Sequence, residues 1–257
     1  MALEACGLNY AIGGRQLIQA LDLAVTAGEC VAIVGPNGAG KTTLFRLLSG
    51  ELHPQQGDIH FNTRPLSQWP VGQLARMRAV LPQASSLQFA FTVQEVVTMG
   101  RMPHDTGRKL DADIVQEVMA VCDVARLSLR SYTELSGGER QRVQLARVLA
   151  QVWRPVPEGE RLLLLDEPTS ALDLAHQLEL MQVVQQVCQA DIAVLIILHD
   201  LNLAARFADR ILMLHEGRTI ALGTPAEVMR ADLIECVFNV KAQIIQHPLY
   251  GCPLVVS

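Results

Sequence analysis

The sequence predicts an α/β fold with a largely parallel sheet, because short β-branched or leucine-rich runs alternate with helical patterns along the chain. Three of these runs are almost wholly apolar, as strands buried on both faces should be: Cys30–Val34, Leu162–Leu165 and Val194–Leu198. Two later runs, Arg210–His215 and Arg218–Ala221, are joined by Glu216 and Gly217 and predict a hairpin.

Helical patterns replace strands in the middle of the chain. Two of the three patterns begin at a capping box, in which a Ser or Thr is followed three residues later by Glu. In chain order we expect a helix opened by Thr92 that ends at Gly100, a helix over Asp111–Cys122, and a helix opened by Ser136 that runs through Leu149. These helices predict a helical subdomain inserted into the α/β core.

The predicted organisation is a single domain over residues 1–257, with a core of 1–85 and 155–257 and the inserted helical subdomain at about 86–154. Residues 154–161, with two prolines and a glycine, are expected to form a loop that returns the chain to the sheet. After about Met229 we expect a helix and then an extended tail, to which no motif gives a role.

Composition excludes several classes of protein. The 257 residues can bury a proper core, and the 18% of charged residues is not the composition of a disordered chain. A net charge of -5 argues against a nucleic-acid partner, which usually faces a basic surface. The six scattered cysteines predict reduced thiols rather than disulfides or zinc. We expect no signal peptide, because no basic segment followed by an apolar core opens the sequence. We also expect no membrane span, because the longest strongly apolar run, Ile192–Leu198, is far too short.

A glycine-rich loop follows the first apolar run and opens a helix, and its sequence matches the full pattern GxxxxGK[ST]. Its backbone N–H groups and the helix N-terminus are expected to hold phosphates. Lys41 would reach the β- and γ-phosphates, and the Thr42 hydroxyl would hold Mg²⁺. The flanking strand and helix disfavour the alternative, a glycine-rich turn with a chance lysine. The predicted nucleotide-binding residues here are Gly35, Pro36, Asn37, Gly38, Ala39, Gly40, Lys41, Thr42 and Thr43.

Two acids, Asp166 and Glu167, follow the apolar run Leu162–Leu165. Such a strand places them at the sheet edge where ligands bind in α/β folds. Asp166 is predicted to hold the Mg²⁺ shell, and Glu167 to orient or deprotonate the attacking water. A strand followed by a solvated acidic turn is the alternative for this segment alone, and the glycine-rich loop makes it improbable. Kinases, GTPases and other ATPases all remain open at this point.

The heptad Leu-Ser-Gly-Gly-Glu-Arg-Gln at residues 135–141 resembles the signature motif of ATP-binding-cassette (ABC) ATPases, which other P-loop proteins lack. In that family this motif contacts the γ-phosphate held by the opposite subunit. The resemblance therefore implies a homodimer in which Ser136, Gly137 and Gly138 complete the partner's nucleotide site. It also implies the fold: a P-loop NTPase (RecA-like) core, an antiparallel β subdomain and the inserted helical subdomain.

Further positions match the family one at a time. Gln83 is similar to the glutamine that senses Mg²⁺ and the γ-phosphate, and Asp173 ends a stretch, residues 170–173, that resembles the segment crossing the dimer interface. His199 matches the histidine that contacts the γ-phosphate, although a lone histidine after a strand is more often structural. Tyr10 could stack on adenine or simply pack on a sheet edge. No segment resembles the NKxD guanine reader, which favours ATP over GTP.

A free-standing cassette resembles the ATPase subunit of an importer. Residues 91–97, 100–104 and 199–204 are similar to the bacterial subgroup that imports iron chelates, haem and cobalamin, and residues 149–161 and 172–177 are most similar to its haemin-importing members. The resemblance implies hydrolysis of ATP with Mg²⁺ to drive haem uptake through two copies of a separate permease subunit. A periplasmic substrate-binding protein would act indirectly, and the chain would be peripheral at the cytoplasmic face of the inner membrane.

Several alternatives remain. The cargo could be a ferric siderophore or cobalamin, because the cassette does not touch the cargo. A cassette ATPase acting on nucleic acid or ribosomes would usually bring tandem cassettes, coiled coils or basic surfaces, none of which the sequence contains. A metabolic P-loop kinase does not account for the signature heptad.

Overall fold

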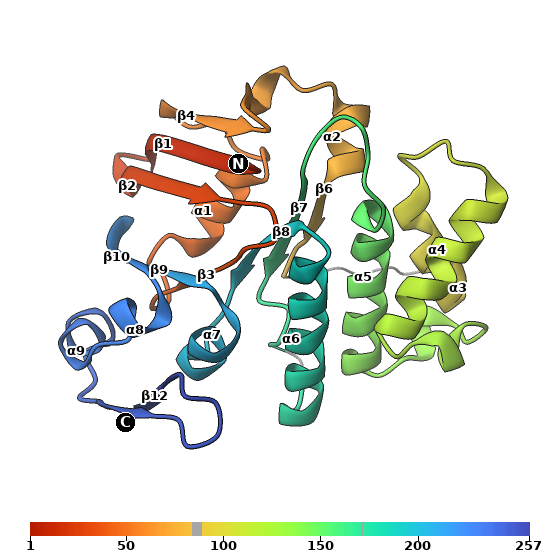
Figure 1. Ribbon diagram of the computed structural model, residues 1–257. Helices are drawn as coiled ribbons and strands as arrows, with labels where there is room; N and C mark the ends of the chain where they lie inside the picture. The colour runs from red at the N-terminus through yellow and green to blue at the C-terminus, as the bar shows by residue number, and fades with distance from the viewer. Residues whose placement is uncertain (84–88, 171) are drawn as a thin grey trace.

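The computed structural model describes residues 1–83, 89–170 and 172–257, and its centre is a six-stranded sheet (Figure 1). Neighbouring strands lie in the order β10-β9-β3-β8-β7-β6, and all pairs are parallel except β9 with β10. The α/β class is confirmed. The strands are β3 Cys30–Val34, β6 Arg78–Leu81, β7 Arg161–Asp166, β8 Ile192–Ile197, β9 Arg210–His215 and β10 Arg218–Gly223.

The three apolar runs form the middle of this sheet, and every residue of β3, β7 and β8 is buried. Alternate residues of β3 point to opposite faces: Ala32 and Val34 join one apolar cluster, and Val31 and Ile33 join the other. β8 begins and ends earlier than expected, so that Leu198 lies beyond it. The predicted hairpin is confirmed as β9 and β10.

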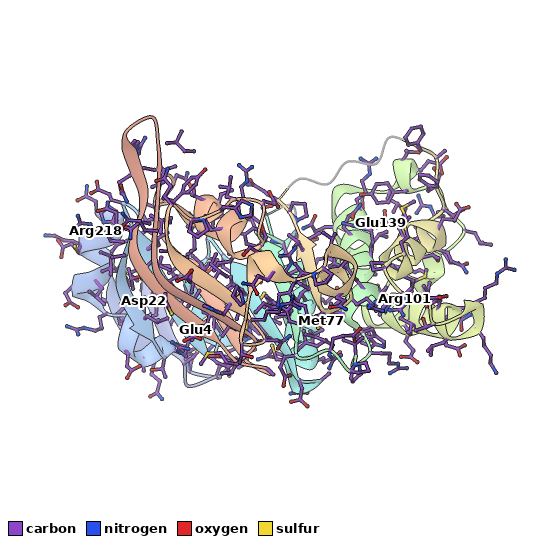
Figure 2. All side chains as sticks on the ribbon, turned by 90° about the horizontal axis from the view of Figure 1, so that it is seen from above. Glu4, Asp22, Met77, Arg101, Glu139 and Arg218 are labelled. Atoms are coloured by element: carbon purple, nitrogen blue, oxygen red, sulfur yellow. The ribbon has the colours of Figure 1, made fainter. Side chains whose placement is uncertain are left out.

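A second sheet is antiparallel, in the order β2-β1-β4-β5, and lies on one side of the molecule (Figure 1). Its strands are β1 Leu3–Ile12, β2 Arg15–Val25, β4 Gln56–Phe61 and β5 Arg64–Pro65. Helices near it are α1 Lys41–Leu48 and α2 Val71–Met77, with a 3-10 turn at Leu66–Gln68. Seen from above, Glu4 and Asp22 of this sheet lie far from Arg101 and Glu139 of the helical segment (Figure 2).

The helical segment contains α3 Val93–Thr98, α4 Arg108–Val121 and α5 Gly137–Val152, with 3-10 turns at Met99–Arg101, Ala125–Leu127 and Tyr132–Glu134. Thr92 and Ser136 form complete capping boxes with Glu95 and Glu139. The first helix was predicted to end at Gly100 but ends at Thr98, and Gly100 lies within the 3-10 turn that follows. A Cβ on Gly100 would lie 2.0 Å from the carbonyl oxygen of Arg147, so the glycine permits close packing against α5. The division into core and insert at about 86 and 154 stays a prediction.

The remaining helices are α6 Leu174–Gln189, α7 Leu201–Phe207, α8 Pro225–Val228 and α9 Ala231–Phe238, and the chain ends in a hairpin of β11 Gln243–Gln246 and β12 Pro253–Val256. The helix and extended tail predicted after Met229 correspond to α9 and to these two strands, which pair with each other. Within the described ranges, no helix combines the length and the apolar character that crossing a membrane requires.

Candidate functional site

The carboxyl ends of β3, β6, β7 and β8 meet at one edge of the central sheet, since these strands run parallel. Each end delivers a predicted site residue or motif. The glycine-rich loop follows β3, Asp166 ends β7 with Glu167 directly after it, Gln83 lies two residues beyond β6, and His199 lies two residues beyond β8. The topology therefore brings together residues that are far apart in the sequence.

The glycine-rich loop occupies the turn between β3 and α1, and Lys41 is the first residue of that helix. A hollow of about 250 Å³ opens beside it. The described residues that line this hollow are Arg15, Leu17, Asn37, Gly38, Gly40, Lys41, Thr42, Thr43 and Glu167. The N-terminal end of α1 therefore faces the hollow, as the binding of an anion by backbone N–H groups requires.

Gly35 is confined by its neighbours as well as by its backbone. A Cβ at this position would lie 2.2 Å from the carbonyl oxygen of Leu214, and its φ is +155°. No side chain fits there without moving β9. Glycine thus allows the loop to cross the end of the central sheet closely before it turns into α1.

Lys41 is held inside the loop rather than in solvent. Its side chain is 6% exposed, and its Nζ donates hydrogen bonds to the carbonyl oxygens of Gly35, at 2.7 Å, and Pro36, at 3.0 Å. Burial lowers the pKa of this ammonium, while the carboxylates of Glu167 and Asp166 oppose that effect. The result is a partly desolvated cation beside the hollow, where its attraction for an anion is stronger than in water.

Asp166 is a buried carboxyl group with an unsatisfied oxygen. It is 4% exposed, and its Oδ1 has no hydrogen-bond partner in the part of the chain that the structure describes. Burial raises the pKa of Asp166 to about 6; Glu167 also raises it, and Lys41 opposes the rise. A buried acceptor oxygen of this kind fits a divalent cation that prefers oxygen ligands, and Thr42, the other predicted ligand from the glycine-rich loop, is exposed in the lining of the hollow.

The side chains of Gln83 and His199 both contact Glu167. Gln83 Nε2 donates to Glu167 Oε2 at 2.7 Å, and His199 Nε2 lies 2.5 Å from Glu167 Oε1. Glu167 also has a φ of +50°, a left-handed backbone conformation that is uncommon for this residue type and often marks functional sites. A carboxylate 11% exposed, held on both oxygens at the rim of the hollow, can act as a base toward a water molecule.

The residues of the heptad at 135–141 do not line this hollow in the described part of the chain. Ser136 is the N-cap of α5, where its hydroxyl accepts from the backbone N–H of Glu139, and the start of this helix does not belong to the described lining of the hollow. A Cβ on Gly138 would lie 3.2 Å from the side chain of Leu172, so this motif packs against residues just before α6. Asp173 is the N-cap of α6 and accepts from His176. Ala171, in the same predicted stretch, lies outside the described residues.

Tyr10 lies on β1, where it packs half-buried against one of the apolar clusters, and does not appear among the described residues lining the hollow. Two residues of β2, Arg15 and Leu17, line it instead. They were missed because their proximity depends on how the second sheet packs on the first. The backbone carbonyl of Leu17 lies 2.6 Å from a Cβ built on Gly40, so the two segments touch.

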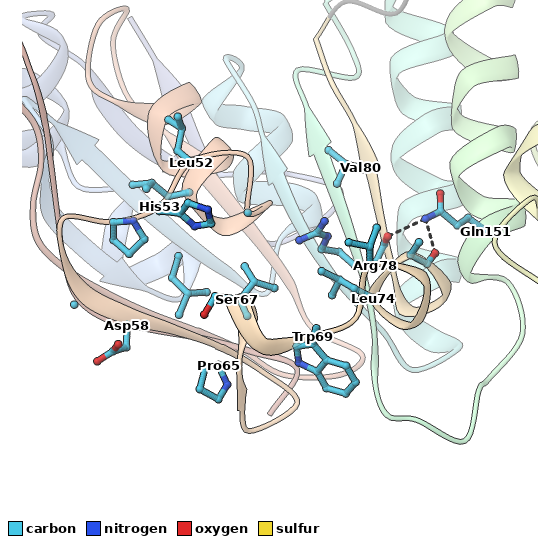
Figure 3. A pocket seen from close by; sticks show the side chains of 18 residues that line it. Leu52, His53, Asp58, Pro65, Ser67, Trp69, Leu74, Arg78, Val80 and Gln151 are labelled. Carbon is cyan, nitrogen blue, oxygen red and sulfur yellow. Dashed lines mark hydrogen bonds between the residues drawn. The ribbon is translucent and has the colours of Figure 1, made fainter.

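A larger hollow of about 820 Å³ lies between the antiparallel sheet and α2 (Figure 3). Leu52, Trp69 and Leu74 contribute apolar surface, and Gln151 donates to the carbonyl oxygens of Ala75 and Arg78 at its edge. None of the predicted site residues lines it. Because residues of the glycine-rich loop and Glu167 line the smaller hollow, we take that one as the candidate site despite its smaller volume.

Comparison with known proteins identifies relatives along the whole chain. A family model described as an ABC transporter matches residues 18–170. Similar proteins include the hemin import ATP-binding protein HmuV of Gloeobacter violaceus, which is 47% identical and covers 99% of this chain and 93% of its own length. The protein of that name from Pseudomonas aeruginosa is 50% identical and covers 99% of both chains.

Solved structures similar to this chain are also ABC transporter proteins. A transporter described as of the metal-chelate type, in an inward-facing conformation, is 28% identical, with a TM-score of 0.82 and coverage of 99% of this chain and 96% of its own. The cbiO1 protein of Clostridium perfringens, part of the ABC transporter complex cbiONQ, is 27% identical, with a TM-score of 0.78 and coverage of 91% and 92%.

Proposed function

This chain belongs to the ABC transporter family of ATPases, and on that premise we propose that it energises haem uptake as the nucleotide-binding subunit of a bacterial importer. The observation that carries the proposal is full-length similarity of 47% and 50% to two relatives named for hemin import. A substrate-specific importer needs this ATPase to recognise its own permease. Similarity that extends over the whole chain, rather than over the ATP motifs alone, therefore favours a shared transport task.

ATP would bind in the hollow beside α1, with its phosphates on the backbone N–H groups of the loop and on Lys41. Arg15 and Leu17 would line the outer side of the nucleotide, with Tyr10 a proposed stacking partner. Thr42, Asp166 and Gln83 would hold Mg²⁺, which supplies neutralisation of the phosphate charge. The unsatisfied Oδ1 of Asp166 supports this assignment.

Glu167 would take a proton from the attacking water, and its position supports this role. Both oxygens are held, one by Gln83 and the other by His199, so that the carboxylate cannot rotate away from the hollow. His199 is 48% exposed and would contact the γ-phosphate from the open side. Hydrolysis yields ADP and phosphate, as in other members of the family.

Two copies would close head-to-tail around two nucleotides. In each copy Ser136, Gly137 and Gly138 lie apart from the described lining of the hollow, so they are available to the hollow of a partner. The start of α5 is a capped helix N-terminus that favours an anion. Asp173 and its neighbours would lie along the dimer interface, and closure would be the step that drives transport.

A permease would bind to the helical segment, in the region from Gln83 to Gly100, of which residues 84–88 lie outside the described part. A hollow of about 520 Å³ beside α3 supports this, since it is lined by Met99 and the 81% exposed side chains of Met102 and Leu129. Exposed apolar surface of this kind commonly marks a protein interface. Two permease subunits would place the chain at the cytoplasmic face of the inner membrane, with a periplasmic binding protein acting indirectly.

A ferric siderophore or another metal chelate is the second candidate cargo, favoured by similarity to the transporter of the metal-chelate type. The two are separated by growth of the source bacterium with haem as sole iron source, using a deletion strain complemented with wild type or with Glu167→Gln. We expect only wild type to restore growth on haem, while inorganic iron serves both strains. Equal growth on haem, with a defect confined to a siderophore, would assign the siderophore as cargo.

Changing Lys41 to alanine is expected to weaken ATP binding by about 10- to 100-fold, because the variant lacks a charge-assisted contact to phosphate. The measurement is titration of the full-length protein with a fluorescent ATP analogue. Lys109→Ala is the matched control, because Lys109 lies exposed on α4, outside the hollow. Unchanged affinity in the Lys41 variant would refute its assignment to phosphate.

A further inference from the structure

The C-terminal hairpin contacts α7, the helix that begins two residues after His199. Ile244 of β11 and Val255 of β12 contact the main apolar cluster of the core. The hairpin is therefore attached to the core through its own apolar side chains, although no motif in the sequence gave it a role. Its contacts with α7 lie on the side of the molecule where the chain ends (Figure 1).

Asn202 makes the most specific of these contacts. Its Nδ2 donates to the carbonyl oxygen of Val255 at 3.1 Å, and its Oδ1 accepts from the backbone N–H of the same residue at 2.8 Å. The side-chain amide thus pairs with a strand residue as another strand would. Both bonds are partly buried, where water competes less for the groups.

A second contact fixes the other end of α7. The guanidinium carbon of Arg206 lies 3.6 Å from the ring centroid of Tyr250, in a cation–π arrangement. The turn that carries Tyr250 is itself ordered, because His247 Nδ1 accepts from the backbone N–H of Leu249 at 3.1 Å and its ring lies 4.6 Å from that of Tyr250. The hairpin therefore holds α7 near both its ends.

The start of α7 in turn fixes the backbone at His199. Asp200 is the N-cap, and its Oδ1 accepts from the backbone N–H groups of Asn202 and Leu203 at 2.7 and 3.1 Å. His199 stands between the end of β8 and this cap, so a shift of α7 moves its backbone directly. The ring of His199 is 48% exposed and is held by its bond to Glu167, with little packing around it.

We infer that the C-terminal hairpin positions His199 toward Glu167 through the Asn202–Val255 pair, and that Asn202 is a positioning residue for hydrolysis. Asn202 does not contribute to the described lining of the nucleotide hollow. It acts through the orientation of His199, whose role rests on the proposed function. Loss of the pair leaves the phosphate-binding loop intact and loosens the histidine.

The test is Asn202→Leu, which keeps the size of the side chain and removes both hydrogen bonds. In the full-length protein we expect kcat for ATP to fall about 3- to 10-fold, with KM for ATP within about twofold of wild type, because misplacing a reacting group lowers the rate more than binding. The imidazole resonances of His199, assigned with His199→Gln, should shift in NMR spectra, while those of the distant His53 and His60 stay unchanged.

Gln243→Leu is the matched control, because Gln243 is an exposed amide on the same hairpin and makes no side-chain hydrogen bond to another described residue. Asn202→Asp keeps the size of the side chain and its acceptor oxygen, removes only the donation to the carbonyl oxygen of Val255, and decides the question if the leucine variant does not fold. Unchanged kcat and unchanged His199 resonances in a folded variant would overturn the inference. If instead Glu167→Gln keeps the full rate, the role proposed for Glu167 fails, and the NMR result for Asn202 still tests the positioning of His199.

Discussion

Replacing Glu167 with glutamine is expected to slow ATP hydrolysis by about 10²- to 10⁴-fold, the usual contribution of a general base. The amide has the size of the carboxylate and can still bond with Gln83, but it cannot accept a proton from water. ATP should therefore bind and remain intact. The measurement is steady-state phosphate release by the full-length protein, together with its sedimentation in saturating ATP and Mg²⁺.

The same variant should accumulate as an ATP-bound dimer, because closure would occur while the reset by hydrolysis would not. Glu235→Gln serves as the control, since Glu235 lies exposed on α9, away from the hollow. A Glu167→Gln protein that stays monomeric in saturating ATP would contradict the closure model. One that hydrolyses at the wild-type rate would show that another group activates the water.

Replacing Asp166 with asparagine is expected to lower Mg²⁺-dependent hydrolysis by at least about 10²-fold and, without ligands, to stabilise the fold above pH 6. The loss of rate follows because a bound metal ion is worth several kcal/mol in such transition states. The gain in stability follows because the substitution removes a carboxylate that is buried and costly to ionise. Raising its pKa from 3.8 to about 6 costs about 3 kcal/mol once the group is ionised.

The pH dependence has a definite sign. Between about pH 4 and 6 the folded protein keeps the Asp166 proton that the unfolded chain has released, so stability from this group falls as pH rises through that window. Above about pH 6, Asp166 is ionised in both states, so the free-energy cost of its burial no longer changes with pH. Urea unfolding of both proteins from pH 4 to 8 should therefore show that the free energy of unfolding of wild type, relative to that of the Asp166→Asn variant, falls between about pH 4 and 6. Asp105→Asn, an exposed change, should keep the wild-type pH dependence, and a difference between wild type and the Asp166 variant that stays constant from pH 4 to 8 would refute the assignment.

Local patterns alone located much of the fold. β3 begins and ends at the predicted residues, because five consecutive apolar residues before a glycine permit little else. The capping boxes at Thr92 and Ser136 are complete, because each depends on contacts within four residues. The glycine-rich loop was found for the same reason, since its pattern, strand and helix are contiguous. The roles assigned to its residues stay predictions.

Packing between distant segments decided the rest. Arg15 and Leu17 reach the hollow because the antiparallel sheet lies against the loop. β6 has only four residues and begins with the charged Arg78, so the sequence pattern does not identify it as a strand. Asn202 and Val255 are 53 residues apart, and no local preference predicts that they pair. The sequence alone determines which chemical groups are present and the conformation of segments a few residues long. The contact of Gln83 and His199 with Glu167 follows instead from the order of the parallel strands. That order is fixed only when the whole sheet is buried.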